Sequence, residues 1–157
     1  MKKFHALFIG RFQPFHNGHL KVIKSILKKG GKITIVIAGP KKIDEKNPFS
    51  FSERERMIRD VLKEEGIKDY RICKVVDVDD DEKWIKKILK LGKFDVAYSR
   101  NPWTIRCLKM AGIPVKKHKF YKRYSQCGRE IRKRIEESRE WKHLVPKKVY
   151  EYIVSRK

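Results

Sequence analysis

The chain has 157 residues, and 41 Lys and Arg against 19 Asp and Glu give it a formal net charge of +22 at pH 7. This length suits one domain over residues 1–157 that buries a core without disulfide staples. The three cysteines, Cys73, Cys107 and Cys127, are too widely spaced to indicate a disulfide framework or a zinc site. No apolar run is long enough to cross a bilayer, and residues 1–5 lead into a strand pattern rather than a signal peptide. We therefore expect a cytoplasmic protein with no membrane association.

The excess of positive charge raises the question of a nucleic-acid partner. The lysines, however, are scattered along the whole chain, and no nucleic-acid-binding motif accompanies them. Scattered lysine is also typical of thermophile surfaces. We therefore expect no specific nucleic-acid binding, although a positive field speeds the capture of a polyphosphate substrate.

Strand-like apolar runs alternate with helical patterns along the chain, which is typical of an α/β fold with a largely parallel sheet. The predicted strands are 4–9, 32–38, 70–76, 94–98 and 114–117. The predicted helices are 18–29, 52–65, 82–91, 102–111, 128–138 and 146–155. This order predicts a Rossmann-like, doubly wound parallel sheet of about five strands flanked by helices.

Local signals support these helix boundaries. Ser52 and Glu55 match a capping box, and Pro102 and Pro146 fall where first-turn prolines are common. Glycines that follow helical patterns serve as stop signals; these are Gly30, Gly31, Gly66 and Gly112.

The segment Gly10–Leu20 reads G-R-F-Q-P-F-H-N-G-H-L and lies where the first strand turns into the first helix. Such a junction presents free backbone N–H groups and the positive end of a helix dipole to an anion. The segment lacks both G-x-G-x-x-G and the Walker pattern. Arg11, His16 and His19 supply side-chain donors in the same turn, and a helix that begins within 14–17 puts both histidines on one face. The segment predicts a phosphate site.

Two histidines three residues apart need a third ligand to hold a metal, and the sequence nearby supplies none with confidence. We therefore predict no metal ligand in the protein.

The segment Gly10–His19 resembles the H-x-G-H signature of the nucleotidyltransferase superfamily, in the form found in archaeal-type nicotinamide-nucleotide adenylyltransferases. Several later segments are similar to motifs of the same family, and these are 47–49 with Glu53 and Arg54, Asp77 with Trp84, 98–102, 130–134 and 141–146. The resemblance implies transfer of the adenylyl group of ATP to the 5′-phosphate of nicotinamide mononucleotide, which gives NAD and pyrophosphate by direct in-line attack. It also implies Mg²⁺ bound with ATP, and the family often forms closed homo-oligomers.

The resemblance assigns residues to two sides of the site. The catalytic set that it implies is Arg11, His16, His19 and Arg132, and its ATP-binding set is Gly10, Phe12, Gly18, Gly39 and Ser125. The acceptor-binding set is Arg54, Asp77, Trp84 and Asn101. Simpler interpretations exist for this last set: Arg54 as a solvated helix residue, Asp77 as a strand-end residue, Trp84 as core and Asn101 as a turn residue.

The chain departs from the family pattern at four places. The Ser-Gly-Thr expected before Glu130 is replaced by 125–129, and the expected Ser-His-Thr loop is replaced by 40–46. Asp81 stands where an asparagine is expected near the nicotinamide, where a negative charge disfavours nicotinate mononucleotide. The usual C-terminal extension is missing after Ile153.

These departures leave alternatives open. One is another H-x-G-H nucleotidyltransferase that acts on a different phosphorylated acceptor, such as a pantetheine-phosphate adenylyltransferase or a cytidylyltransferase. The other is a non-catalytic nucleotide- or RNA-binding protein, against which the intact Arg11, His16, His19 and Arg132 argue.

Overall fold

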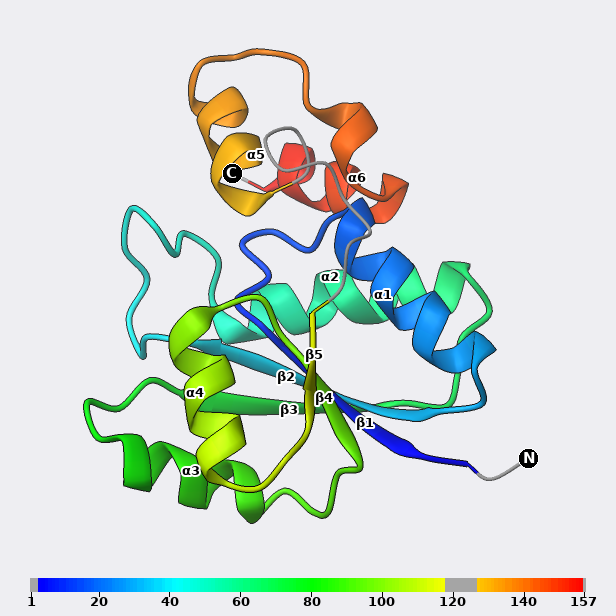
Figure 1. Cartoon of the computed structure of the whole chain (residues 1–157). Helices are drawn as coiled ribbons and strands as arrows, with labels where there is room; N and C mark the ends of the chain where they lie inside the picture. Colours follow the sequence, from blue (N-terminus) through cyan, green and yellow to red (C-terminus); the bar gives the residue numbers. More distant parts are fainter. Residues whose placement is uncertain (1–2, 118–126, 157) are drawn as a thin grey trace. The chain divides into compact units, whose positions relative to one another are not determined.

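The apolar runs form a five-stranded, fully parallel sheet in the computed structural model, which describes residues 3–117 and 127–156 (Figure 1). The strands are β1 His5–Gly10, β2 Lys32–Gly39, β3 Arg71–Val76, β4 Val96–Tyr98 and β5 Val115–Lys116. Their order in the sheet is β3-β2-β1-β4-β5, which is a doubly wound order. The predicted Rossmann-like α/β fold is confirmed.

The helices also follow the predicted order, with ends within two residues of those expected. They are α1 Asn17–Lys28, α2 Phe51–Glu64, α3 Asp81–Leu89, α4 Pro102–Met110, α5 Gly128–Glu136 and α6 Lys147–Ser155, with a short 3₁₀ helix η1 at Lys142–Leu144. The 3₁₀ helix was not predicted, because three residues are too few to produce a hydrophobic period.

The described residues fall into two compact units built from interleaved stretches of chain. The first unit takes its residues from Met1–Gly10, Ile23–Lys41 and Asp69–His118 and holds the sheet with α3 and α4. The second takes its residues from Arg11–Val22, Lys42–Lys68 and Lys119–Lys157 and holds α2, α5 and α6 with the start of α1. The single domain over residues 1–157 stays a prediction.

The first unit has a core that covers one face of the sheet. Leu7 and Ile9 of β1 alternate with residues that point to the opposite face, as the period of a strand requires. Side chains of α3 and α4, which lie side by side (Figure 1), pack in the same cluster as Leu7 and Ile9. The buried members of the cluster are Leu7, Ile9, Val36, Val75, Trp84, Ile88, Ala97, Cys107, Leu108 and Ile113.

Two details of the predicted helix starts are wrong. The capping box of α2 is formed by Ser50 and Glu53, not by Ser52 and Glu55: the Ser50 side chain accepts the Glu53 N–H at 3.1 Å, and the Glu53 side chain accepts the Ser50 N–H at 3.0 Å. The sequence S-F-S-E-R-E contains the S-x-x-E pattern twice, so the pattern alone does not fix the register. Pro146 precedes α6 as its N-cap, whereas Pro102 begins α4 as predicted.

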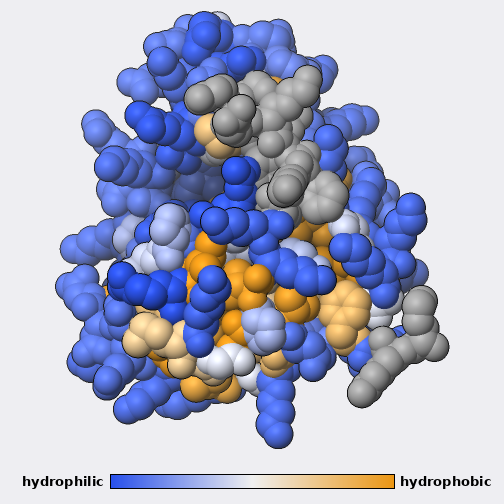
Figure 2. Space-filling view, in the orientation of Figure 1, coloured by the Kyte–Doolittle hydropathy of each residue, from blue (hydrophilic) through white to orange (hydrophobic). Residues whose placement is uncertain are grey.

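Most of the face seen in Figure 2 is hydrophilic, in keeping with a chain in which 38% of the residues are charged. Within the described segments, no helix has both the length and the apolar character that crossing a membrane requires.

Candidate nucleotide-binding site

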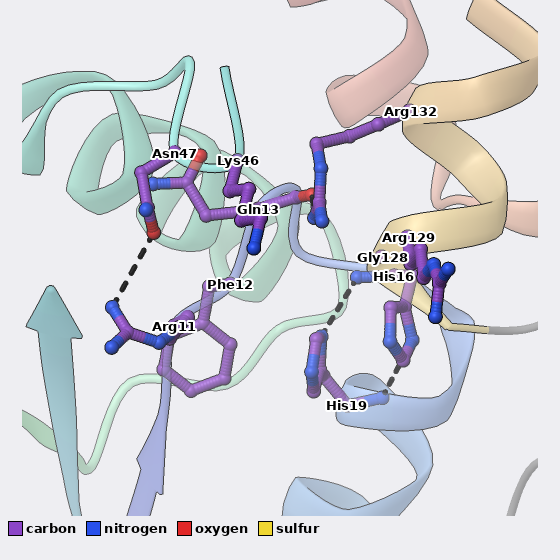
Figure 3. Close-up of a pocket in the computed structure, with 10 residues that line it drawn as sticks. All are labelled: Arg11, Phe12, Gln13, His16, His19, Lys46, Asn47, Gly128, Arg129 and Arg132. Carbon is purple, nitrogen blue, oxygen red and sulfur yellow. Dashed lines mark hydrogen bonds between the residues drawn. The ribbon is translucent and has the colours of Figure 1, made fainter. Parts of the chain in front are cut away.

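A cavity of about 360 Å³ lies in the second unit, and its lining carries an excess of positive charge (Figure 3). The lining residues are Arg11, Phe12, Gln13, His16, His19, Lys46, Asn47, Gly128, Arg129 and Arg132. Four of the ten are Arg or Lys and two are His. The four residues that the sequence analysis placed in catalysis, Arg11, His16, His19 and Arg132, therefore line one cavity.

The two histidines of the H-x-G-H motif cap the start of α1. His16 precedes the helix, and its Nδ1 atom accepts the backbone N–H groups of Gly18 at 3.1 Å and His19 at 3.4 Å. In return, Nδ1 of His19 accepts the backbone N–H of His16 at 3.1 Å (Figure 3). This reciprocal arrangement is a capping box in which imidazole nitrogens replace the usual hydroxyl and carboxylate oxygens. Gly18 contributes its backbone to this cap.

The cap defines the tautomer of each ring. A backbone N–H only donates, so an Nδ1 atom that accepts it carries no proton. The hydrogen-bond network therefore assigns the ring proton of both histidines to Nε2. The rings stack with 3.6 Å between their centroids, and the Phe12 ring meets His19 edge-on at 4.7 Å. Phe12 is buried with a left-handed backbone (φ 52°), which is costly for a residue with a side chain.

Arg132 enters the cavity from α5, and Gly128 makes room for it. Its Nη1 atom donates to the backbone carbonyl of Gln13 at 2.7 Å. Burial lowers the pKa of the Arg132 guanidinium, and the nearby Arg129 acts in the same direction. A Cβ atom at position 128 would lie 2.9 Å from the Gln13 carbonyl oxygen and 3.0 Å from Arg132 Nη1, which is too close. Gly128 therefore allows the partly buried Arg132 guanidinium to occupy this position in the cavity lining. An anionic ligand in the cavity would pair with this guanidinium.

The loop 44–47 brings Lys46 and Asn47 to the cavity. Asp44 Oδ1 accepts the backbone N–H groups of Lys46 at 2.9 Å and Asn47 at 2.8 Å, and the Asn47 side-chain amide at 3.0 Å. The hydrogen bond from the Asn47 side chain is the largest cause that lowers the pKa of Asp44. Asn47 Oδ1 then accepts from Arg11 Nη1 at 3.4 Å (Figure 3). The loop that departs from the family pattern is thus ordered by a carboxylate and supplies a lysine of its own.

Gln13 is a site residue that the sequence analysis missed. Its side chain is buried, donates to the Phe49 carbonyl at 3.0 Å and accepts the Phe49 N–H at 2.9 Å. A glutamine amide matches one backbone unit in this way because it has a donor and an acceptor side by side. The signal available in the sequence was a polar residue between Phe12 and Pro14, which is not specific.

Arg54, predicted on the acceptor side, lies under the motif. Its side chain is 1% exposed, and its Nη1 donates to the Arg11 carbonyl at 2.7 Å while Nε donates to the Ser50 carbonyl at 3.2 Å. The structure excludes the solvated helix residue that was the simpler interpretation. A contact with the acceptor stays a prediction.

The remaining predicted residues, apart from Ser125, belong to the first unit, where we describe them by themselves. Gly10 ends β1 and Gly39 ends β2, and the Gly39 carbonyl accepts the N–H of Asp77 at 2.8 Å. Asp77 is exposed, and Asn101 caps α4 by accepting the Thr104 N–H at 3.0 Å. Trp84 is 1% exposed and packs edge-to-face against Trp103 at 5.0 Å. Ser125 lies outside the described residues.

Asp81, the departure expected to repel a second carboxylate, is paired within the first unit. It accepts from Trp103 Nε1 at 2.9 Å and forms an ion pair with Arg106 Nη2 at 3.1 Å. The guanidinium compensates the negative charge, so this residue alone gives no electrostatic reason to exclude nicotinate mononucleotide.

The donor set of the described residues does not fit a metal ion held by the protein. No group of three or more His, Cys, Asp or Glu is gathered among them in a way that could bind one. The cavity instead carries an excess of cationic side chains, which attract phosphate oxygens.

Comparison with known proteins places this site in a class. The sequence model of the cytidylyltransferase-like family matches residues 7–149. A bifunctional NMN adenylyltransferase/ADP-ribose pyrophosphatase from Francisella tularensis, solved with AMP and a manganese ion, superposes with a TM-score of 0.77 at 27% identity over 90% of this chain. The chain spans 44% of that protein. The fold and the H-x-G-H site thus define a nucleotidyltransferase-type domain.

Curated relatives narrow the class. The nicotinamide-nucleotide adenylyltransferase of Methanolobus tindarius is 41% identical over 150 residues, which cover 94% of this chain and 86% of the relative. That of Archaeoglobus fulgidus is 35% identical over 155 residues, which cover 94% of this chain and 89% of the relative. The chain belongs to the family of nicotinamide-nucleotide adenylyltransferases.

Proposed function

We propose that this chain transfers the adenylyl group of ATP to the 5′-phosphate of nicotinamide mononucleotide and releases NAD and pyrophosphate. The proposal rests on one observation: the stacked imidazoles of His16 and His19 line the same cavity as the guanidinium groups of Arg11 and Arg132. The family of the chain supplies the reaction, and the cavity supplies groups that this reaction needs.

The reaction needs positioning and charge neutralisation more than a protein nucleophile. An oxygen of the mononucleotide phosphate forms a bond to the α-phosphorus of ATP, and the bond from that phosphorus to the bridging oxygen breaks. Negative charge then grows on the departing pyrophosphate. Arg11 and Arg132 would pair with that charge, and the Nε2–H groups of His16 and His19 would donate to its oxygens.

We propose that Mg²⁺ reaches the site as part of the MgATP substrate, held by phosphate oxygens and water. This fits a cavity whose lining side chains include more Arg, Lys and His than residues with an oxygen atom that could bind Mg²⁺. Lys46 and Arg129 add positive charge for the rest of the triphosphate.

Further roles are proposed on the resemblance. Gly10, Phe12, Gly18, Gly39 and Ser125 are assigned to ATP, and Arg54, Asp77 and Asn101 to the acceptor. Trp84, which the resemblance also assigns to the acceptor, is 1% exposed and is proposed instead as a core residue. Arg54 would act by supporting the Arg11 backbone, since its guanidinium is bound there. The closed homo-oligomer that the resemblance implies stays a prediction that light scattering tests.

The test is to incubate the purified protein with Mg²⁺ and either ATP or CTP, with a panel of phosphorylated acceptors, and to follow pyrophosphate. The panel contains nicotinamide mononucleotide, nicotinate mononucleotide, phosphopantetheine and phosphocholine. We expect NAD from ATP and nicotinamide mononucleotide, and loss of activity in Arg132→Ala but not in the matched variant Lys133→Ala on the same helix. Pyrophosphate with another acceptor alone would replace the proposal with a different nucleotidyltransferase, and none with any acceptor would favour a binding protein.

A further inference from the structure

The last turn of α6 holds the loop that leads into α2, and this loop borders the phosphate cavity. We propose that Arg156, together with Tyr152, is a positioning residue for triphosphate binding; the inference rests on the proposed function. Neither residue lines the cavity of about 360 Å³. Their effect would pass through the segment 47–54 and Gln13.

Arg156 contacts this segment in three ways. Its Nε atom forms an ion pair with Glu53 Oε2 at 2.6 Å, and its Nη2 atom donates to the Pro48 carbonyl at 3.1 Å. Its guanidinium also lies over the Phe49 ring, 4.8 Å from the centroid. Because a guanidinium is planar and offers several donors, one side chain makes all three contacts at once.

One side-chain oxygen of Glu53 takes part in the capping box of α2, and the other binds Arg156 and Tyr152, the pair that we call the clamp. Oε1 accepts the Ser50 N–H and closes the capping box of α2. Oε2 accepts from Arg156 and, at 3.3 Å, from the Tyr152 hydroxyl. Burial raises the pKa of Tyr152, and the Glu53 carboxylate acts in the same direction, so the hydroxyl keeps the proton that it donates. The end of α6 therefore fixes where α2 begins.

The segment held by this clamp touches the cavity at two points. Phe49, under the Arg156 guanidinium, exchanges both of its backbone hydrogen bonds with the Gln13 side chain. The Gln13 backbone carbonyl in turn accepts from Arg132. On the other side of Pro48, Asn47 lines the cavity and accepts from Arg11.

A second cavity of about 240 Å³ adds to the connection, because Phe49, Arg132, Ile153 and Arg156 all line it. The phosphate-binding arginine and the clamp arginine thus border the same space. Loss of the Arg156 side chain would enlarge this space and leave Glu53 without its cation, so both Phe49 and Arg132 would gain freedom to move.

The sequence analysis assigned no role to Arg156 or Tyr152. The resemblance ends before Arg156, and a basic residue at the end of a helix is usually explained by the helix dipole. Its partners, Pro48, Phe49 and Glu53, are about a hundred positions away in the sequence, so only the folded chain brings them together.

The experiment compares wild type with Arg156→Ala, Arg156→Lys, Tyr152→Phe and the matched control Lys148→Ala, which removes an exposed ion pair to Glu151 on the same helix. ATP binding is measured by calorimetry with MgATP alone, and KM and kcat are measured by pyrophosphate release. For Arg156→Ala we expect the dissociation constant and the KM for ATP to rise about threefold to tenfold, with kcat within about twofold of wild type. Arg156→Lys should recover part of the loss, Tyr152→Phe should give a smaller rise, and Lys148→Ala should change neither constant.

Wild-type ATP affinity in Arg156→Ala would overturn the inference, and so would a lower melting temperature with an unchanged KM for ATP. If Arg156→Ala does not fold, the smaller change Arg156→Lys decides, since it keeps the charge and loses the planar contacts. If the wild-type protein binds MgATP but forms no pyrophosphate with any acceptor, the proposed function fails, and the calorimetric comparison still tests the clamp.

Discussion

The imidazole rings of His16 and His19 lie 3.6 Å apart at an angle of 20°, and Nδ1 of each ring accepts the backbone N–H of the other residue. In each histidine, Nδ1 therefore has a structural function, and the proposed function assigns the phosphate contact to Nε2–H. The Nδ1 atoms close the first turn of α1, which leaves the Nε2–H groups as the ring donors. A substitution that keeps the first function and removes the second separates them.

His16→Asn is such a substitution, because asparagine is a strong N-cap residue whose Oδ1 can accept the same N–H groups. Its shorter side chain has no donor at the position of Nε2. We expect turnover to fall about a hundredfold, whereas the free energy of unfolding should change by no more than about 2 kcal/mol. Pyrophosphate release and chemical denaturation measure the two effects. Near-normal turnover in a folded His16→Asn protein would remove His16 from the chemistry.

Gly128→Ala tests whether the position of the Arg132 side chain requires a glycine as the first residue of α5. The added Cβ would fall 2.9 Å from the Gln13 backbone carbonyl oxygen and 3.0 Å from Arg132 Nη1. The carbonyl or the helix must therefore shift, and this disturbs the hydrogen bond that Arg132 donates to that carbonyl. We expect kcat/KM to drop about tenfold to a hundredfold. Stability should fall little, because alanine favours a helix more than glycine does. Steady-state kinetics and a melting curve check this, with the exposed Lys133→Ala on the same helix as the control. Unchanged kinetics would mean that the helix shifts freely and that the glycine is not required.

Trp84→Phe distinguishes a core residue from a stacking platform. With 1% of its surface exposed and Trp103 packed edge-on against it, Trp84 belongs to the core of the first unit. We expect Trp84→Phe to lower the free energy of unfolding by about 1–3 kcal/mol, the cost of removing buried volume. The KM for nicotinamide mononucleotide should stay within about twofold of wild type. A raised KM with unchanged stability would favour stacking on the nicotinamide, the role that the resemblance implies.

The course of the chain could be predicted from the sequence because it depends on local signals. Continuous β-branched runs such as 32–38 indicate strands buried on both faces, and the helical period of 18–29 indicates the crossover helix. The position of the H-x-G-H motif between the first strand and this helix followed from connectivity alone. Its cap did not, because no rule for helix starts includes a pair of histidines that cap each other.

The supporting residues could not be predicted, because their partners are distant in the sequence. Gln13 binds the backbone of Phe49, Arg54 binds the carbonyl of Arg11, and Arg156 binds Glu53. Single-sequence patterns report periodicity within an element and not which loops meet. The choice of Ser50 over Ser52 as the cap of α2 has a local reason instead, since the S-x-x-E pattern occurs at both positions and does not fix the register.

The pH dependence of stability should carry a contribution from His5 at the start of β1. Its Nε2 atom lies 2.8 Å from Thr34 Oγ1, and Arg71 Nε donates to the same hydroxyl at 3.3 Å. Burial lowers the pKa of His5, and the Arg71 guanidinium acts in the same direction, with Lys32 adding to them and the Asp95 carboxylate opposing them.

The sign of the effect follows from this direction. As the pH falls below about 6.5, the His5 side chain of the unfolded chain takes up a proton, whereas that of the folded chain resists it. The unfolded state then binds more protons, so the free energy of unfolding falls with the pH until the lowered folded pKa is reached. Urea denaturation at about pH 7.5 and about pH 5.5 should show a loss that is smaller in His5→Gln than in wild type. His143→Gln, which changes an exposed histidine of η1, serves as the matched control for replacing a histidine by glutamine. An equal loss in wild type and His5→Gln would show that His5 takes up its proton alike in both states.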